Sequence, residues 1–383
     1  MAVAVHISCD VDMLANSPDL PKSIYDEGEE IFGSTERDAL IKEALAMGAQ
    51  PPFASGVIRP TIRWGLEYTR FNRIEGLSSA VRVEQNIGAG YTASLEGRIG
   101  HADLEPNVEL MLARSNLAKT IRGRAYNRLV SVGDWGNPLS FGSSLSAVLF
   151  GRDEGFYYRA SGLELEYARD VGAPLTWRFF AERQRTAAPD NEFTLGTRFI
   201  PNVVARTGQY AGVATRFIHT RGLDPNGFRL FTDLRVESAI SDSAHAVFGR
   251  GALDLTFAQG LGPLATALTL SGGASTGAVP AQRRWYLGGT HSVRGQRADT
   301  SRSGNAYWLS RLEIGRSTQG IRPVVFGDAG WVGDRSSWKA VGRPMSGVGV
   351  GASGFDGLVR LDLSRGLHPV KRFRLDMYVE ARF

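Results

Sequence analysis

The sequence contains very little cysteine, little lysine beyond its first segment, and no long hydrophobic helix. Its one cysteine, Cys9, cannot form an intramolecular disulfide, and one thiol does not make a zinc site. The six histidines show no H-E-x-x-H or other metal-binding spacing. A fold stabilised by internal disulfide bonds is therefore excluded, and no metal or other cofactor is expected.

The longest uncharged stretch covers residues 255–282, but it contains two prolines and five glycines, which a membrane-spanning helix of about 20 apolar residues would not favour. It is better described as two strands, LDLTFA and LATALTLSG, joined by the turn QGLGP. The first residues, MAVAVHISCDVDML, lack the basic start, apolar middle and small-residue cleavage site of a signal peptide. We therefore expect neither a spanning helix nor a signal peptide.

The charged residues are numerous but evenly spread. Lysine and arginine number 44 against 39 acidic residues, and they form no clustered basic stripe of the kind that nucleic acids bind. No nucleic-acid partner is expected. After residue 56 only three lysines occur, so arginine carries almost all the basic charge there. Arginine and carboxylates at nearly matched frequency favour bidentate ion pairs in a confined space.

From residue 61 onward, apolar and charged residues alternate almost everywhere. In RFRLDMYVEARF, residues 372–383, the alternation has no error and ends on the aromatic Phe383. Successive side chains of a strand point to opposite faces, so such a segment has one apolar and one charged face. Further segments with this pattern begin near residues 61, 81, 163, 175, 228 and 359.

These segments are roughly 9–13 residues long, which matches strands tilted across a bilayer rather than the shorter strands of soluble proteins. Up to eighteen can be counted, but residues 192–199 and 120–129 give weak signals, so about sixteen is favoured. The pattern predicts an all-β fold, a transmembrane antiparallel β-barrel with lipid outside and a wet, charged lumen inside. The terminal Phe383 is typical of bacterial outer-membrane barrels. The alternative is a soluble β-sandwich, whose polar face would carry more serine, threonine and lysine.

Two motifs narrow the class of barrel. The longest polar connection of this region, AQRRWYLGGTHSVRGQRADTSRSG, contains GGTHSVRGQ at residues 288–296. Downstream, VFGDAGW contains the pattern F-x-D-x-G at Phe326, Asp328 and Gly330. Because these three residues alternate with apolar neighbours on the strand, they are expected to face the lumen.

Together the two motifs resemble the bacterial surface antigen superfamily, which includes outer-membrane protein assembly factors and two-partner secretion transporters. The resemblance covers roughly residues 265–383 well, with five strands after the loop, and the earlier strands by pattern only. It implies that a long extracellular loop folds into the lumen, where Arg294 pairs with Asp328. The loop motif comprises Gly288, Gly289, Val293, Arg294 and Gly295. Position 296 is glutamine, where the family usually has an aromatic residue. The alternative to an inserted loop is an ordinary extracellular loop in which the Arg-Gly sequence occurs by chance.

Two short motifs match the residue patterns of enzyme signatures but lack the secondary structure that those signatures require. GVGASG, residues 349–354, is followed by a strand, whereas a dinucleotide fingerprint requires a helix there. The alternating Gly347, Gly349 and Gly351 instead predict a smooth lumen wall that leaves room for the inserted loop. GASTG, around Ser275, is likewise followed by no helix, so a nucleophile elbow is not supported. No catalytic residue is expected.

By resemblance, the function is assembly or insertion of outer-membrane proteins, or protein secretion, at the bacterial cell outer membrane. The implied partners are outer-membrane lipid and unfolded outer-membrane or secreted polypeptides. Residues 57–383 are expected to form the barrel, and residues 1–56 a periplasmic or linker segment with one short helix. These 56 residues are too few for a periplasmic polypeptide-binding domain with a linker. The alternative is therefore a passive pore or membrane anchor of a larger protein whose periplasmic domain is missing here.

Overall fold

The computed structural model describes residues 59–379, apart from 117, 134, 170–173, 190, 223, 225–226, 243–244, 317–319, 341 and 355–358. The chain from Ile58 onward forms one compact unit. The expected segment 1–56, with its short helix, and the terminal Phe383 lie outside the described residues.

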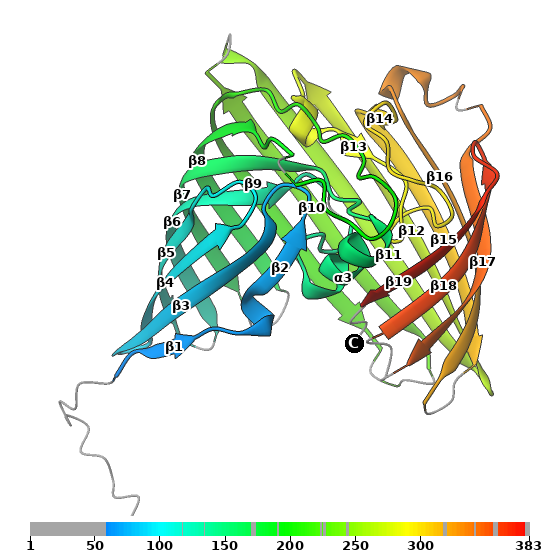
Figure 1. Cartoon of the computed structure of the whole chain (residues 1–383), viewed down its shortest axis with the longest axis horizontal. Coiled ribbons are helices and arrows are strands. Elements are labelled where there is room, and N and C mark those ends of the chain that lie inside the picture. Colours follow the sequence, from blue (N-terminus) through cyan, green and yellow to red (C-terminus); the bar gives the residue numbers. More distant parts are fainter. Residues whose placement is uncertain are drawn as a thin grey trace, which may run out of the picture. The chain divides into compact units, whose positions relative to one another are not determined.

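The described chain forms one long antiparallel sheet that curls round an interior (Figure 1). The first strand position is shared by β1 (Thr61–Arg63) and β2 (Thr69–Asn72), because both pair with β3. Each later strand of this sheet pairs with the one that follows it in the sheet, with β12 pairing β15 across the short β13–β14 ladder, which gives sixteen strand positions and confirms the expected all-β antiparallel architecture. In order, the strands are β3 (Gly76–Gly88), β4 (Tyr91–Gly100), β5 (Asn107–Ser115), β6 (Lys119–Ser131), β7 (Tyr157–Arg169), β8 (Leu175–Thr186), β9 (Gly208–Arg221), β10 (Arg229–Ser241), β11 (Val247–Leu261), β12 (Leu264–Gly277), β15 (Ala306–Arg316), β16 (Arg322–Gly333), β17 (Met345–Gly354), β18 (Val359–His368) and β19 (Phe373–Val379).

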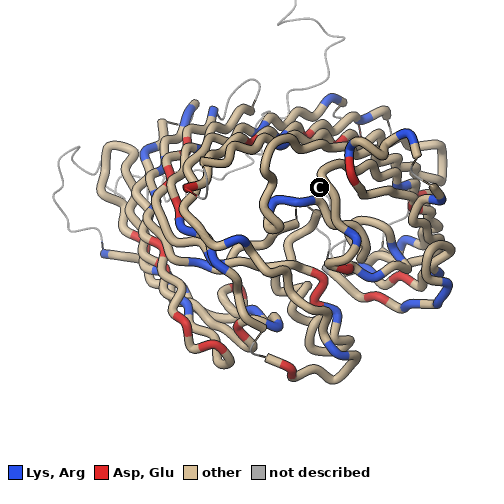
Figure 2. The backbone as a smooth tube through the Cα atoms, turned by 90° about the horizontal axis from the view of Figure 1, so that it is seen from above, with Lys and Arg blue, Asp and Glu red and all other residues tan. Residues whose placement is uncertain are grey.

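The two faces of the sheet differ as the alternation predicts. On β7, Leu163 and Leu165 are 63% and 51% exposed, whereas Glu164 between them is 5% exposed. On β19, Leu375 is exposed, whereas Arg374 and Asp376 are buried. Exposed leucines on the outer face and buried ion pairs on the inner face are the arrangement of a membrane barrel with a polar lumen. Seen from above, basic and acidic residues are distributed around the wall, and long connections cross the interior (Figure 2).

The connections at the two ends of the barrel differ in length. At one end they are short, as in the tight β11–β12 turn, which confirms the predicted hairpin. At the other end several connections are longer, and three of them carry secondary structure of their own. These additional elements are α3 (Phe141–Phe150) between β6 and β7, η3 (Ala281–Arg283), β13 (Trp285–Tyr286) and β14 (Ser303–Gly304) between β12 and β15, and η4 (Arg335–Ser337) between β16 and β17. Short periplasmic turns and longer extracellular loops are usual in outer-membrane barrels.

Three details refine the predicted strands. The weak signal at 120–129 lies within β6, whereas the one at 192–199 lies in the β8–β9 connection and is not a strand. The alternating segment that begins at residue 61 is not one strand, because Gly65 adopts φ 124° and the turn of 3-10 helix η1 (Leu66–Tyr68) follows it. No helix in the described part of the chain is long and apolar enough to span a membrane.

The first and last strands face each other across a seam. Among the described residues, no residue-by-residue ladder register joins β19 to β2. Helix α3 lies between them and contacts both strands (Figure 1). This seam is the place where the curled sheet meets its own beginning.

Candidate functional site

The connection between β12 and β15 contains the GGTHSVRGQ motif, and its backbone requires glycine at three points. Gly288, Gly289 and Gly295 have φ values of 120°, 105° and 80°, in a region that side-chain-bearing residues rarely adopt. A Cβ atom at Gly288 would lie 2.5 Å from the carbonyl oxygen of Arg297. One at Gly295 would lie 2.6 Å from the backbone nitrogen of Gly366, on β18. The loop therefore turns tightly while it is in direct contact with the barrel wall.

Arg294 lies at the tip of this loop and binds Asp328 of β16 through three hydrogen bonds. Its Nε donates to Asp328 Oδ2 and its Nη2 to Oδ1, both at 2.6 Å, and its backbone N–H donates to Oδ2 at 3.0 Å. Arg294 is only 1% exposed. The structure thus brings the two motifs of the sequence together in a bidentate pair, a geometry that fixes position as well as charge.

The pair is part of a larger charge network on three further strands. Arg294 Nη1 donates to Glu313 Oε1 of β15 at 2.5 Å, and Arg360 Nη1 of β18 donates to the other oxygen of Glu313 at 2.9 Å. Arg360 Nε also donates to Asp362 Oδ1 at 2.9 Å, and the Tyr378 hydroxyl of β19 donates to Oδ2 at 2.7 Å. A single loop residue is therefore linked, directly or through Asp362, to four of the five strands from β15 to β19, all except β17.

The guanidinium of Arg294 also lies against an aromatic ring. Its Cζ is 3.6 Å from the centroid of Phe326, the first residue of the F-x-D-x-G motif. Burial alone would lower the pKa of Arg294, but the hydrogen bonds and charge of Asp328, together with the charge of Glu313, raise it above its ordinary value. The loop arginine is held as a cation between a carboxylate pair and a π face.

The wall next to the loop is smooth, as the alternating glycines predict. A Cβ atom at Gly347 on β17 would overlap the carbonyl oxygen of Arg294. A Cβ atom at Gly330 would lie 3.2 Å from Cδ1 of Leu287, in the loop. Val293 is fully buried and packs in one cluster with Leu287 and side chains of the wall. Glycine on the wall therefore allows the loop backbone to approach closely.

Gln296 occupies the position where the resembled family has an aromatic residue. Its side chain forms hydrogen bonds to the backbone instead of packing as a ring would. Its Nε2 donates to the backbone oxygens of Ser346 and Val370, both at 3.0 Å, and its Oε1 accepts from the Val370 N–H at 3.3 Å. The side chain is completely buried. It fastens the loop to β17 and to the β18–β19 turn.

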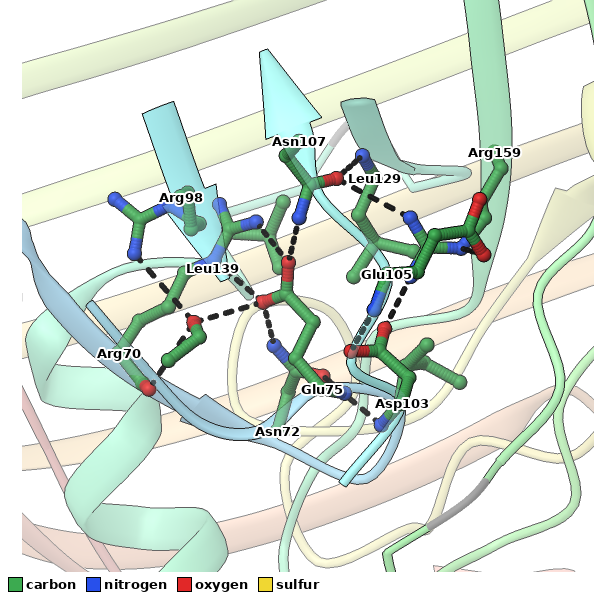
Figure 3. A network of polar contacts seen from close by, with 12 residues as sticks. Arg70, Asn72, Glu75, Arg98, Asp103, Glu105, Asn107, Leu129, Leu139 and Arg159 are labelled. Carbon is green, nitrogen blue, oxygen red and sulfur yellow. Dashed lines mark hydrogen bonds and ion pairs between the residues drawn. The ribbon is translucent and has the colours of Figure 1, made fainter. Parts of the chain in front are cut away.

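A second buried cluster surrounds the β2–β3 turn (Figure 3). The carboxylate of Glu75 accepts from Arg70 Nε at 2.8 Å and Nη2 at 2.7 Å, and from the side-chain amides of Asn72 and Asn107 at 2.8 Å. Burial would raise the pKa of Glu75, but the hydrogen bonds and charge of Arg70 outweigh it and lower the pKa. This turn, like the loop, is therefore anchored by an ionised pair inside the barrel.

Sequence reasoning missed most of these partners. Glu313, Arg360 and Asp362 appear in the sequence only as charged residues on alternating strands, and their convergence on Arg294 depends on strand register. The turn sequence FNRIEG offered one signal of the second cluster. Two charged residues and an asparagine in one tight turn favour hydrogen bonds within the protein over an ordinary solvent-exposed loop. Among the described residues, no group of three or more potential ligands could hold a metal ion.

Comparisons with known proteins give a consistent result. A family model described as haemolysin secretion/activation protein ShlB/FhaC/HecB matches residues 211–354, which include both motifs. The fold is similar to that of BamA from Haemophilus ducreyi lacking POTRA domains 1–3, with 13% identity over 83% of this chain and 69% of that chain and a TM-score of 0.53. No curated protein matches the sequence.

Two solved structures of CdiB are also similar, at 14% identity each. The match with CdiB from Escherichia coli covers 80% of this chain and 59% of that chain, with a TM-score of 0.49. The match with CdiB from Acinetobacter baumannii covers 81% and 56%, with a TM-score of 0.45. This chain therefore spans less than two thirds of the length of either CdiB chain.

A sixteen-position antiparallel sheet with an apolar outer face and an arginine loop inside defines an outer-membrane β-barrel of the protein secretion or assembly type. Transporters of this type are not enzymes. Over residues 211–354 the chain is similar to the haemolysin secretion/activation family, and its fold is similar to that of BamA.

Proposed function

We propose that this barrel secretes a polypeptide across the bacterial outer membrane, in the manner of a two-partner secretion transporter. The observation that carries the proposal is the match of the haemolysin secretion/activation model to residues 211–354. That range runs from β9 to β17 and contains the Arg294 loop and Asp328. In this proposal residues 57–383 form the translocating barrel, residues 1–56 its periplasmic or linker segment, and Phe383 its C-terminal assembly signal.

The inserted loop has the properties of a positioned element of such a transporter. Arg294 is bound to several strands at once, and Gly295 and Gln296 contact β17, β18 or the turn after β18. Breaking a buried ion pair by removing one partner costs about 3–5 kcal/mol, so this loop holds one defined place in the lumen. We assign to Arg294 and Asp328 the role of positioning residues for the translocation path.

Space for such a path lies beside the loop. A cavity of about 430 Å³ is lined by side chains of β7 to β11 and by Trp285 of the loop. Its wall carries both signs of charge, including Arg178, Arg235 and Glu237. An extended polypeptide crossing this region would meet polar groups that can bond its backbone without favouring one sequence.

Depletion of the protein in its native host tests the proposal. The secretion role predicts that one or a few surface or secreted polypeptides disappear, while the amounts of other outer-membrane barrels stay at the level of undepleted cells. A general fall of folded outer-membrane barrels would instead support an assembly role. If neither population changes, the chain acts as a passive pore or anchor and the proposal fails. Replacing the protein by its Asp328→Asn variant, instead of depleting it, then shows whether secretion needs the pair of Arg294 and Asp328.

A further inference from the structure

The outer face of β15 and β16 changes character toward the end of the barrel that holds the inserted loop. Farther from that end, Leu312 and Val325 are exposed apolar side chains of this face. Nearer to it, Trp308 and Trp331 lie directly opposite each other on the same face. Aromatic side chains of outer-membrane barrels gather where hydrocarbon gives way to polar headgroups. The two tryptophans therefore mark the level of the extracellular headgroups on this side of the barrel.

Just beyond these tryptophans, the connection from β16 to β17 carries exposed cations. Arg335, Lys339 and Arg343 are all exposed, and Trp338 among them is 62% exposed. The Lys339 Nζ atom lies 5.7 Å from the ring centroid of Trp338. Within the part of the chain that the structure describes, none of the three cations forms an ion pair. Their charges are therefore available to an external anion.

The backbone of this connection is held in a defined position. Asp334 Oδ1 accepts from the backbone N–H and from the hydroxyl of Ser336, both at 2.9 Å, and so caps the short helix η4. The Arg335 N–H donates to Asn305 Oδ1, before β15, at 2.5 Å. These bonds fix the backbone and occupy the single acid of the connection, while the basic side chains stay exposed.

The neighbouring strands β18 and β19 repeat this arrangement of apolar, aromatic and basic residues. Leu363 is exposed on the outer face of β18, and Arg365 follows it on the same face. The Cζ atom of Arg365 is 5.2 Å from the ring centroid of Phe373, its exposed cross-strand partner on β19. Ser346 of β17 lies opposite His368 of β18, so the register places the β16–β17 and β18–β19 connections side by side.

The charge of these two connections is strongly one-sided. Residues 334–344 and 365–373 together contain six basic residues and one acid. Residues 101–106, another connection at the same end of the barrel, contain two acids and no lysine or arginine. Lys339 and Lys371 are also two of the three lysines after residue 56. A lysine ammonium binds phosphate as a point charge, whereas arginine suits the bidentate carboxylate pairs of the lumen.

We propose that a phosphorylated lipid of the outer leaflet binds through its phosphate groups to a rim patch formed by Arg335, Trp338, Lys339, Arg343, Arg365, Lys371 and Phe373. The aromatic rings suit the interface with the lipid, and the neighbouring cations attract its phosphates. A free phosphate ion would use the cations alone, whereas a lipid also uses the rings and the apolar outer face below them. This inference goes beyond secretion and holds whether or not the barrel secretes a polypeptide.

Binding can be measured with the full chain refolded in detergent and titrated with bisphosphorylated lipid A by thermophoresis. The same lipid without its phosphates should bind at least about tenfold more weakly. The variant Arg335→Gln, Lys339→Gln, Arg343→Gln should lose at least about tenfold in affinity for the bisphosphorylated lipid, because each basic residue near a charged lipid surface contributes a factor of about five.

Lys119→Gln, Arg221→Gln, Arg316→Gln is the matched control, because it removes three exposed cations at the opposite end of the barrel with the same change in net charge. Its affinity should equal that of the parent protein. If the triple rim variant does not fold, Lys339→Gln with Lys371→Gln replaces it and should lose at least about fivefold.

Inorganic phosphate, at the same concentration of phosphate groups, should not displace the lipid. The proposal is overturned if removal of the lipid phosphates leaves the affinity unchanged, or if the folded rim and control variants bind equally well. Displacement of the lipid by inorganic phosphate would also overturn it, since the patch would then bind phosphate ions without regard to lipid.

Discussion

Replacing Asp328 by asparagine tests the loop pair most economically, because the substitution preserves size and removes only charge. Arg294 Nε and Nη2 both donate to the Asp328 carboxylate at 2.6 Å. An asparagine side chain keeps one acceptor oxygen, but it presents an amide N–H₂ to a guanidinium that can only donate. We expect the variant to lose one charge-assisted bond and to leave a buried cation undercompensated.

The size of the effect follows from the burial of the partners. Removing one member of a buried pair costs about 3–5 kcal/mol, and the remaining bond to Glu313 places the expected loss near the lower limit, about 3 kcal/mol. Asp233→Asn is a matched control. Arg216 donates to both oxygens of Asp233 at 2.9 Å, but the side chain of Arg216 is 52% exposed. A solvent-screened pair of this kind contributes about 0–1 kcal/mol.

The assay is urea unfolding of the detergent-refolded barrel, followed by tryptophan fluorescence and by the shift of the folded band in unheated gels. The free energy of unfolding of Asp328→Asn should fall by about 3 kcal/mol, and that of Asp233→Asn by no more than about 1 kcal/mol. Equal losses in the two variants would refute the argument, since they would show that the lumen screens the Arg294 pair as effectively as water does.

Three further outcomes are expected. Gly347→Val should displace the loop, because even a Cβ atom there overlaps the Arg294 carbonyl oxygen. Single-channel recordings of this variant should show larger or more frequent openings than those of the parent protein. Unchanged recordings would contradict the close contact between the loop and β17. Gln296→Ala leaves the partly buried backbone groups of Val370 and Ser346 without this partner and should lower the free energy of unfolding by about 1–3 kcal/mol in the same urea assay. Leu165→Arg on the outer face should cost about 2–4 kcal/mol when folding into lipid is measured, and an effect near zero would mean that this face does not meet hydrocarbon.

The sequence predicts the strands well, because alternation is a local property and each strand records it independently. RFRLDMYVEARF indicates β19 and its two faces without knowledge of any neighbour. The meeting of Arg294 and Asp328 could be anticipated from the resemblance of two motifs. Glu313 and Arg360 could not, because only the register of β15 and β18 determines which of many lumen charges lie near the loop.

Other features depend on long-range packing that no local pattern records. Residues 141–150, FGSSLSAVLF, form α3 because Ser140 caps the helix and because β2 and β19 bind it from two sides. The sequence reasoning assigned no element there, since the segment alternates poorly and has no charged positions. The break at Gly65 was missed for a similar reason, because a glycine within an alternating run does not reveal its φ.

A disulfide between the inserted loop and the barrel wall tests the central claim, that the Arg294 loop is seated inside the lumen against β16. In a Cys9→Ser background, Leu287→Cys and Gly330→Cys should cross-link in native outer membranes, because a Cβ atom at Gly330 lies 3.2 Å from Leu287 Cδ1. Thr256→Cys and Thr269→Cys on the neighbouring strands β11 and β12, whose hydroxyls are 3.0 Å apart, provide the positive control. The account predicts that both pairs oxidise; it is contradicted if the strand pair cross-links and the loop pair stays reduced.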